Sequence, residues 1–290
     1  MPIGGGLHPA TKNGCESALR CANVALEKRG ATMPRFAANL GMLFADRPLV
    51  QRIGAAAAAG FKAVELQIPY ATPAAEVRAE VERHGLTMLG LNTPMGREGE
   101  SGLAAMPGRE QDFATAFKQA LDYVVAVNGS AIHCMSGLVP PEQRPAAERV
   151  YIANLSRAAD LAAEKNITIL IEPINPRDRP TYFLTRPEQA ADVIDKIGKP
   201  NVKLQFDFYH TQISGGDLLT RFEKHLPWIG HVQVAAVPSR AEPDEGEINY
   251  PAVFEMVDKL GYRGWISAEY KPRGRTEDGL NWMRAAAQRN

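Results

Sequence analysis

Four oxygen-bearing side chains stand at the ends of four successive apolar runs in the second half of the chain. They are Glu172 in IEPIN, Asp207 in QFDFYH, Gln233 in HVQVAA and Glu269 in SAEYKP. If neighbouring parallel strands bring these ends together, the three carboxylates repel one another unless a cation holds them. Three carboxylates and one amide carbonyl form an all-oxygen shell, which suits Mg²⁺ or Mn²⁺ better than zinc. The pattern therefore predicts a divalent metal site.

Further polar residues accompany these four. Glu65 also ends an apolar run, where a structural acid is the favoured interpretation. His210 follows the predicted aspartate ligand by one helical turn of sequence, so we expect it to orient substrate or to support the metal shell. His231 shares a strand face with Gln233 and could face the interior or serve packing, and packing is at least as good an explanation for His133.

Cations follow the last two of these runs. Arg240, Lys271 and Arg273 are positioned to grip an anionic substrate beside an acidic metal site, and a solvated loop charge is the alternative for each. We assign substrate binding to His210, Arg240 and Lys271.

Elements that could carry these residues alternate along the chain from Met33. Strands are predicted over 36–40, 63–67, 87–91, 131–134, 167–172, 202–207, 231–235 and 265–269. Helices are predicted near 48–59, 73–84, 109–127, 142–165, 186–197, 216–225, 250–260 and 276–288. Strands that alternate with helices indicate a parallel sheet, and eight such units in about 255 residues match a (β/α)8 TIM barrel. Chemistry in such a barrel lies at the carboxyl ends of the strands.

Proline and glycine support the boundaries. Prolines 48, 73 and 187 stand where first helical turns should begin, and glycines 60, 85 and 261 stand where helices should end. An open doubly wound sheet would require a glycine-rich phosphate turn after the first strand, and NLGMLF is not one. The segment 92–107 has no clear periodicity, which is typical of a lid over the mouth of a barrel.

Composition limits the remaining classes. The 290 residues carry 33 basic and 33 acidic side chains, so no basic excess indicates a nucleic-acid partner. No apolar run approaches the roughly 20 residues of a membrane span, and three irregularly spaced cysteines argue against a disulfide framework. We expect a cytoplasmic protein that could form a homo-oligomer. Residues 1–32 are expected to be a disordered extension or a mis-assigned start, and 33–290 a single catalytic barrel.

Several longer motifs point to one family. RFAANLGMLF, GLAAMPGRE, LIEPIN, QFDFYH, HVQVA, EPDEGEINYP and GWISAEYKPRGRTEDGL together resemble the hydroxypyruvate isomerase family, which includes the 2-oxo-tetronate isomerases and belongs to the xylose-isomerase-like barrels. The resemblance runs from Met33 almost to the C-terminus. It implies a TIM barrel with a divalent metal held by Glu172, Asp207, Gln233 and Glu269. It also implies that Glu172 and Glu269 are the acid/base pair.

The activity implied by this resemblance is an aldose–ketose type isomerisation of a small anionic hydroxy-oxo acid. Hydroxypyruvate and tartronate semialdehyde are the expected pair, and 2-oxo-tetronate is the alternative substrate. A ketose 3-epimerase is less favoured, because related epimerases carry a histidine ligand where this chain has Gln233. A zinc-cluster endonuclease would need more than the 6 histidines present and a basic face. A non-catalytic barrel would be expected to lack one of the four ligands.

Overall fold

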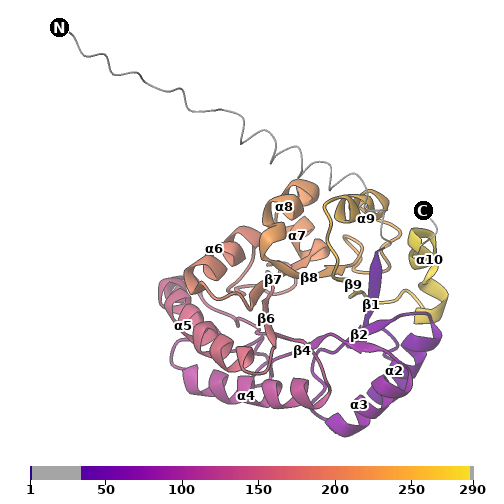
Figure 1. Ribbon diagram of the computed structural model, residues 1–290, viewed down its shortest axis with the longest axis horizontal. Coiled ribbons are helices and arrows are strands. Elements are labelled where there is room, and N and C mark those ends of the chain that lie inside the picture. Colours follow the sequence, from indigo (N-terminus) through magenta and orange to yellow (C-terminus); the bar gives the residue numbers. More distant parts are fainter. Residues whose placement is uncertain (2–33, 288–290) are drawn as a thin grey trace.

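The computed structural model describes residues 34–287, together with Met1. One parallel sheet curls into a barrel, and helices surround it (Figure 1). Its strands are β1 (Arg35–Asn39), β2 (Ala63–Glu65), β3 (Thr87–Met88), β4 (Gly90–Asn92), β5 (Ala131–His133), β6 (Thr168–Ile171), β7 (Val202–Asp207), β8 (Ile229–Val234) and β9 (Trp265–Ala268). The expected extension over residues 1–32 falls, apart from Met1, outside the described residues and stays a prediction.

The barrel closes through an interrupted strand. The strand order is β3-β2-β1-β9-β8-β7-β6-β5-β4, and β3 and β4 are two pieces separated by Leu89. The Leu89 amide donates to the Val64 carbonyl at 2.9 Å, and the Leu66 amide donates to the Gly90 carbonyl at 2.9 Å, which joins β2 to both pieces. The predicted (β/α)8 barrel is therefore confirmed, with its third strand divided rather than continuous over 87–91.

The helices follow the predicted alternation, with one addition. They are α2 (Leu49–Ala58), α3 (Ala74–Arg83), α4 (Glu110–Ala126), η1 (Pro141–Gln143), α5 (Arg144–Ala163), α6 (Pro187–Ile197), α7 (Phe208–Ser214), α8 (Leu218–His225), η2 (Leu226–Trp228), α9 (Tyr250–Lys259), η3 (Thr276–Gly279) and α10 (Asn281–Ala287). Sequence periodicity missed α7, whose first turn begins directly after β7 because the Asp207 carboxylate accepts a hydrogen bond from the Tyr209 amide. Among residues 34–287, no helix combines the length and the apolar character that a bilayer-spanning helix requires.

Helix boundaries agree with the proline and glycine positions. Pro48 and Pro73 occupy the N-cap positions of α2 and α3, and Pro187 is the first residue of α6. Gly60, Gly85 and Gly261 all have positive φ just beyond a helix, a conformation that costs glycine little. The predicted starts and stops are thus confirmed at these positions.

Alternation along β7 shows how the chain separates two environments. Val202, Leu204 and Phe206 are buried in the main apolar core, where the rings of Phe206 and Phe222 lie 5.4 Å apart. Successive side chains of a strand point to opposite faces, so Gln205 and Asp207 point into the barrel. TIM-barrel interiors are usually filled by branched apolar side chains, whereas the interior here contains buried carboxylate, amide and imidazole groups. The core therefore lies between sheet and helices, and the barrel interior is polar.

Candidate functional site at the carboxyl ends of the strands

The structure places the four predicted ligands on four neighbouring strands. Glu172 follows β6, Asp207 ends β7, Gln233 lies in β8 and Glu269 follows β9. Asp207 is paired in register with Gln233, so these side chains stand at one level of the barrel. All four are buried, with 2–6% of their surface exposed. The fold therefore gathers them at the end of the barrel where chemistry was expected.

Glu172, Asp207 and His210 form the tightest group. Each offers one atom such that all three atoms lie within 4.8 Å of one another. The His210 Nε2 atom lies 3.8 Å from Glu172 Oε1 and 3.6 Å from Asp207 Oδ2. Within the described part of the chain, those two carboxylate oxygens have no hydrogen-bond donor. Buried oxygens of like charge without donors are costly, and a divalent cation between them would satisfy both.

The acidic groups raise one another's pKa. Burial raises the pKa of Glu172 well above its usual value, and the charges of Glu269 and Asp207 add to the effect. Burial also raises the pKa of Glu269 to about 8 and that of Asp207 to about 6, although the Arg240 charge opposes both shifts. A bound divalent cation would favour the ionised forms of all three. The electrostatics fit the predicted metal site.

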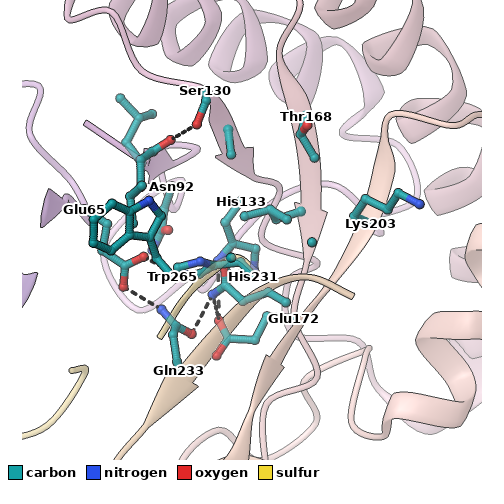
Figure 2. A pocket seen from close by; sticks show the side chains of 18 of the residues that line it. Glu65, Asn92, Ser130, His133, Thr168, Glu172, Lys203, His231, Gln233 and Trp265 are labelled. Atoms are coloured by element: carbon teal, nitrogen blue, oxygen red, sulfur yellow. Dashed lines mark hydrogen bonds and ion pairs between the residues drawn. The ribbon is translucent and has the colours of Figure 1, made fainter. Parts of the chain in front are cut away.

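Gln233 and Glu269 are connected to this group through hydrogen bonds. The Gln205 Nε2 atom donates to Glu172 Oε2 at 2.9 Å and to Gln233 Oε1 at 2.8 Å (Figure 2). Glu269 Oε1 accepts from Gln67 Nε2 at 3.0 Å and from Arg240 at 3.1 Å. Thus Glu172, Asp207 and His210 form one group. The other two predicted ligands, Gln233 and Glu269, lie beside this group and have hydrogen-bond partners of their own. The metal-ligand and acid/base roles stay predictions.

Hydrogen bonds at the far side of His210 decide what its ring can do. The Asn175 Oδ1 atom accepts from the Asp178 amide at 2.9 Å, which turns Asn175 Nδ2 toward His210 Nδ1 at 2.6 Å. Burial and the nearby Arg240 charge also lower the pKa of His210 well below its usual value, so the ring is neutral. With Nδ1 as acceptor, the proton of the neutral ring is on Nε2. The Arg240 guanidinium, which can only donate, also stands 3.5 Å from Nε2, so Asn175 and Arg240 compete for the one acceptor nitrogen of the neutral ring. The Asn175 contact of 2.6 Å is much the shorter and favours the proton on Nε2, an arrangement that suits a substrate oxygen better than a metal ion.

The two predicted cationic substrate ligands differ in position. The Arg240 guanidinium lies 3.1 Å from Glu269 and 3.3 Å from Asp178, and it stands 4.9 Å above the Tyr209 ring. Lys271 is exposed, and its backbone amide donates to the Arg240 carbonyl at 2.8 Å. Arg240 is therefore part of the site, whereas Lys271 supports the Arg240 backbone and its side chain has no contact with the site among the described residues.

Several polar residues of the site were not anticipated. Gln205 precedes Asp207 by two residues in β7, and the two-residue period of a strand could have placed it in the interior. Gln67 lies just after β2 and shares the two-residue period of Glu65 in the predicted strand 63–67, whereas Asn175 and Asp178 lie in the loop after β6, where no periodicity indicates orientation. Strand positions were thus detectable from the sequence, and loop positions were not.

A second polar layer lies one step below the carboxylates. Glu65 Oε1 accepts hydrogen bonds from Asn39 and Gln233, both at 2.8 Å, and Glu65 Oε2 lies 2.6 Å from His231 Nε2. Burial opposes ionisation of Glu65, but the charge and hydrogen bonds of its partners outweigh burial and lower its pKa to about 2. Burial lowers the pKa of His133 to about 3, so that ring is neutral. Both carboxylate oxygens of Glu65 thus have partners, as expected of a structural acid.

A cavity of about 400 Å³ occupies the barrel interior. Glu172, Gln233 and Glu269 line one part of it, and Thr168 and Lys203 line the part near the beginnings of the strands (Figure 2). The cavity thus extends from the carboxylates through the polar layer toward the amino ends of the strands, and polar groups on its walls can hold water there.

The loop between β4 and α4, predicted as a lid, is anchored in its second half. The Ala104 and Ala105 amides donate to the Met135 and Ser136 carbonyls at 3.2 and 2.7 Å, and Asn154 donates to the Ala104 carbonyl at 2.9 Å. Only the part near residues 95–99 is largely exposed. Movement of this part over the mouth stays a prediction.

Comparisons with known proteins agree with the fold. Residues 53–286 match the family described as xylose isomerase-like TIM barrel. The 2-oxo-tetronate isomerase of Cupriavidus necator is 47% identical over 255 residues, with 87% of this chain and 98% of the relative covered. A human protein provisionally named hydroxypyruvate isomerase is 44% identical, with 87% of this chain and 94% of the relative covered. A crystal structure from Brucella melitensis, titled as a family 2 AP endonuclease, is 44% identical, has a TM-score of 0.85 and covers 87% of this chain and 99% of its own.

This chain belongs to the xylose isomerase-like TIM barrels. Within them it belongs with the hydroxypyruvate and 2-oxo-tetronate isomerases, as the motifs had indicated, and it is an isomerase-type enzyme. The expected fold, family and enzyme class are confirmed.

Proposed function

We propose that the protein moves a carbonyl between C2 and C3 of a short hydroxy-oxo carboxylate. One carboxylate removes the proton from the hydroxyl-bearing C3 of the 2-oxo acid, which leaves an enediolate. A protonated carboxyl group then delivers a proton to C2, and the carbonyl now stands at C3. The proton of the C3 hydroxyl passes to the oxygen on C2, so atoms and charge balance: one carbon-bound proton is taken and one is returned, and one hydroxyl proton changes oxygen. The observation that carries the proposal is the pair of buried carboxylate oxygens without donors, one on Glu172 and one on Asp207, at the carboxyl ends of adjacent strands.

Glu172 and Glu269 are the proposed acid/base pair, and they exchange roles with the direction of reaction. They come from different strands, so they can face the substrate from two sides. In the metal-free protein their raised pKa values mean that a proton can reside on either carboxyl near neutral pH. His210 would donate its Nε2–H to a substrate oxygen, and Arg240 would bind the substrate carboxylate.

Mg²⁺ or Mn²⁺ is the proposed cofactor. Glu172 and Asp207 have the free oxygens to hold it, and Gln233 and Glu269 are the proposed further ligands. When bound, the cation would stabilise the negative charge of the enediolate. Removal of divalent ions by a chelator should abolish turnover, and added Mn²⁺ or Mg²⁺ should restore it.

Two substrates are candidates. Hydroxypyruvate is supported by the LIEPIN motif and by the name of the 44% identical human relative. 2-Oxo-tetronate, one carbon longer, is supported by the name of the 47% identical Cupriavidus relative and by the segment after β8. We place 2-oxo-tetronate first because the relative that carries this name is the more similar of the two, at 47% identity against 44%.

The decisive assay measures both substrates side by side with the purified protein and Mn²⁺. We expect kcat/KM to be higher for 2-oxo-tetronate, with turnover of hydroxypyruvate detectable. A higher value for hydroxypyruvate would reverse the order of the substrates. No turnover of either, together with inversion at C3 of a ketose, would replace the isomerase proposal by the epimerase alternative.

A further inference from the structure

The second polar layer contains a carboxylate that the reaction does not use. We propose that Glu65 is a positioning residue that holds the Gln233 side-chain amide in one of its two orientations, with the carbonyl oxygen toward the metal ligands and the NH₂ group away from them. The inference deepens the proposed function, because it assigns Gln233 its ligand atom.

The Gln233 amide needs such a device. Its oxygen and nitrogen ends are nearly equal in size and shape, so packing barely distinguishes the two orientations. Only the oxygen end can coordinate a cation, because the NH₂ group carries two hydrogens and presents positive charge. The orientation must therefore be set by hydrogen bonds.

Glu65 fixes one end of the amide. A carboxylate only accepts hydrogen bonds, so the group that faces Glu65 Oε1 at 2.8 Å must be the Gln233 NH₂. Glu65 is itself held in place, because Asn39 Nδ2 donates to the same oxygen and His231 contacts the other. The carboxylate is buried, with 6% of its surface exposed.

Gln205 supports the same direction from the opposite end. Its NH₂ group donates to Glu172 Oε2 at 2.9 Å and to Gln233 Oε1 at 2.8 Å (Figure 2). The hydrogen bonds thus run from Gln205 to Gln233 to Glu65, and each of them pairs a donor with an acceptor. If Gln233 were reversed, two NH₂ groups would face each other at one end and two acceptor oxygens at the other. The chain Gln205–Gln233–Glu65 therefore has one consistent direction.

The test is the Glu65→Gln variant, with Mn²⁺ binding as its readout. Glutamine has the shape of glutamate but can donate to the Gln233 oxygen, so residue 65 no longer requires the Gln233 NH₂ group and only Gln205 still opposes the reversed orientation. We expect the Kd for Mn²⁺ alone, measured by titration calorimetry or by the spectrum of free Mn²⁺, to rise by about 10- to 100-fold. A Kd equal to that of the wild type would overturn the proposal.

A matched control is His231→Gln. It removes the other contact of Glu65 but leaves the bond between Glu65 and Gln233. We expect its melting temperature to fall while its Kd for Mn²⁺ stays within about threefold of wild type. An increase in Kd as large as that of Glu65→Gln would mean that general disruption of the layer, rather than amide orientation, sets the affinity, and the proposal would fail.

The exchanged pair Glu65→Gln with Gln233→Glu provides the rescue. The new glutamine at 65 can donate to the new carboxylate at 233, which again offers an oxygen to the metal. We expect the Mn²⁺ affinity of the double variant to exceed that of Glu65→Gln by at least about tenfold. This gain should be larger than the change in affinity that Gln233→Glu alone causes in the wild-type protein. Equal effects of Gln233→Glu in both backgrounds would show simple charge addition and overturn the proposal.

The same exchanged pair covers the case in which Glu65→Gln does not fold. It must then fold and bind Mn²⁺, and its failure to do so counts against the inference. Because these measurements need no substrate, they are independent of the isomerase assay. A failure of the isomerase assay would leave the Mn²⁺-binding result intact, and a failure of the binding test would leave the isomerase assay unaffected.

Discussion

Glu65 and Glu269 are the same amino acid in the same barrel, both buried, yet their carboxyl groups have opposite properties. Hydrogen bonds and the His231 charge lower the pKa of Glu65 to about 2, whereas burial and neighbouring carboxylates raise the pKa of Glu269 to about 8. Depth of burial therefore does not determine the state of an acid here. Glu65 has partners on both carboxylate oxygens without any ligand, whereas Glu172 and Asp207 each leave one buried oxygen without a donor, and a cation would stabilise their ionised forms.

The strongest test of this comparison removes the upper charges. Glu172→Gln and Glu269→Gln should each lower kcat by about 10²- to 10⁴-fold, the range for general acid–base groups. Both variants should fold, and their metal-free melting temperatures should equal or exceed that of the wild type, because a repelling charge has been removed. Exposed Glu164→Gln serves as the control and should retain full turnover. Turnover near that of the wild type in either site variant would refute its acid/base role.

A second test compares the two cations near the upper layer. Arg240→Ala should lower kcat/KM by about 10- to 100-fold, as loss of a charge-assisted hydrogen bond to a substrate carboxylate would, mainly through a higher KM. Lys271→Ala should change kcat/KM by less than about tenfold, because its side chain is exposed and its backbone alone contacts Arg240. Equal losses in the two variants would show that Lys271 reaches the substrate after all.

The smallest expected effect is the pH dependence of stability in the metal-free protein. Because the Glu269 carboxyl has a folded pKa of about 8 against its ordinary value of 4.5, the folded state binds this proton more tightly than the unfolded state. Its contribution therefore favours folding at low pH and is lost as pH rises from about 4.5 to about 8. Glu65 has the opposite sign, because its lowered pKa stabilises the fold above about 4.5, and this contribution is lost as pH falls toward about 2.

Thermal melting between pH 5 and 8 measures the first of these contributions. The metal-free wild type should lose several degrees as pH rises, and Glu269→Gln should show a flatter profile. Saturating Mn²⁺ should also flatten the profile, because the cation favours the ionised carboxylates. A metal-free profile as flat as that with Mn²⁺ would contradict the raised pKa.

The barrel and the strand-end acids could be predicted because periodicity determines both. The run Ile167–Ile171 indicates a buried strand, and topology then brings the residue after it, Glu172, to the mouth. The orientation of loop side chains such as Asn175 depends on contacts between distant segments, which no local pattern encodes. The helix that carries His210 was missed because α7 is only seven residues long and is capped by Asp207, a residue already assigned to the metal. Substrate identity depends on pocket shape at the level of one carbon, which residue spacing does not describe.

The anchored loop after β4 has a consequence for local opening. The Gly102 amide donates to the Met95 carbonyl at 2.9 Å, so the two ends of the exposed part are joined to each other. Opening of residues 96–101 can therefore occur without separating the loop from Met135 and Ser136. In native-state hydrogen exchange, the amides of Ala104 and Ala105 should be protected like those of the barrel, and those of Gly96 and Gly99 should exchange far earlier. A boundary between slow and fast amides inside one loop would mark where the scaffold ends and the entrance begins.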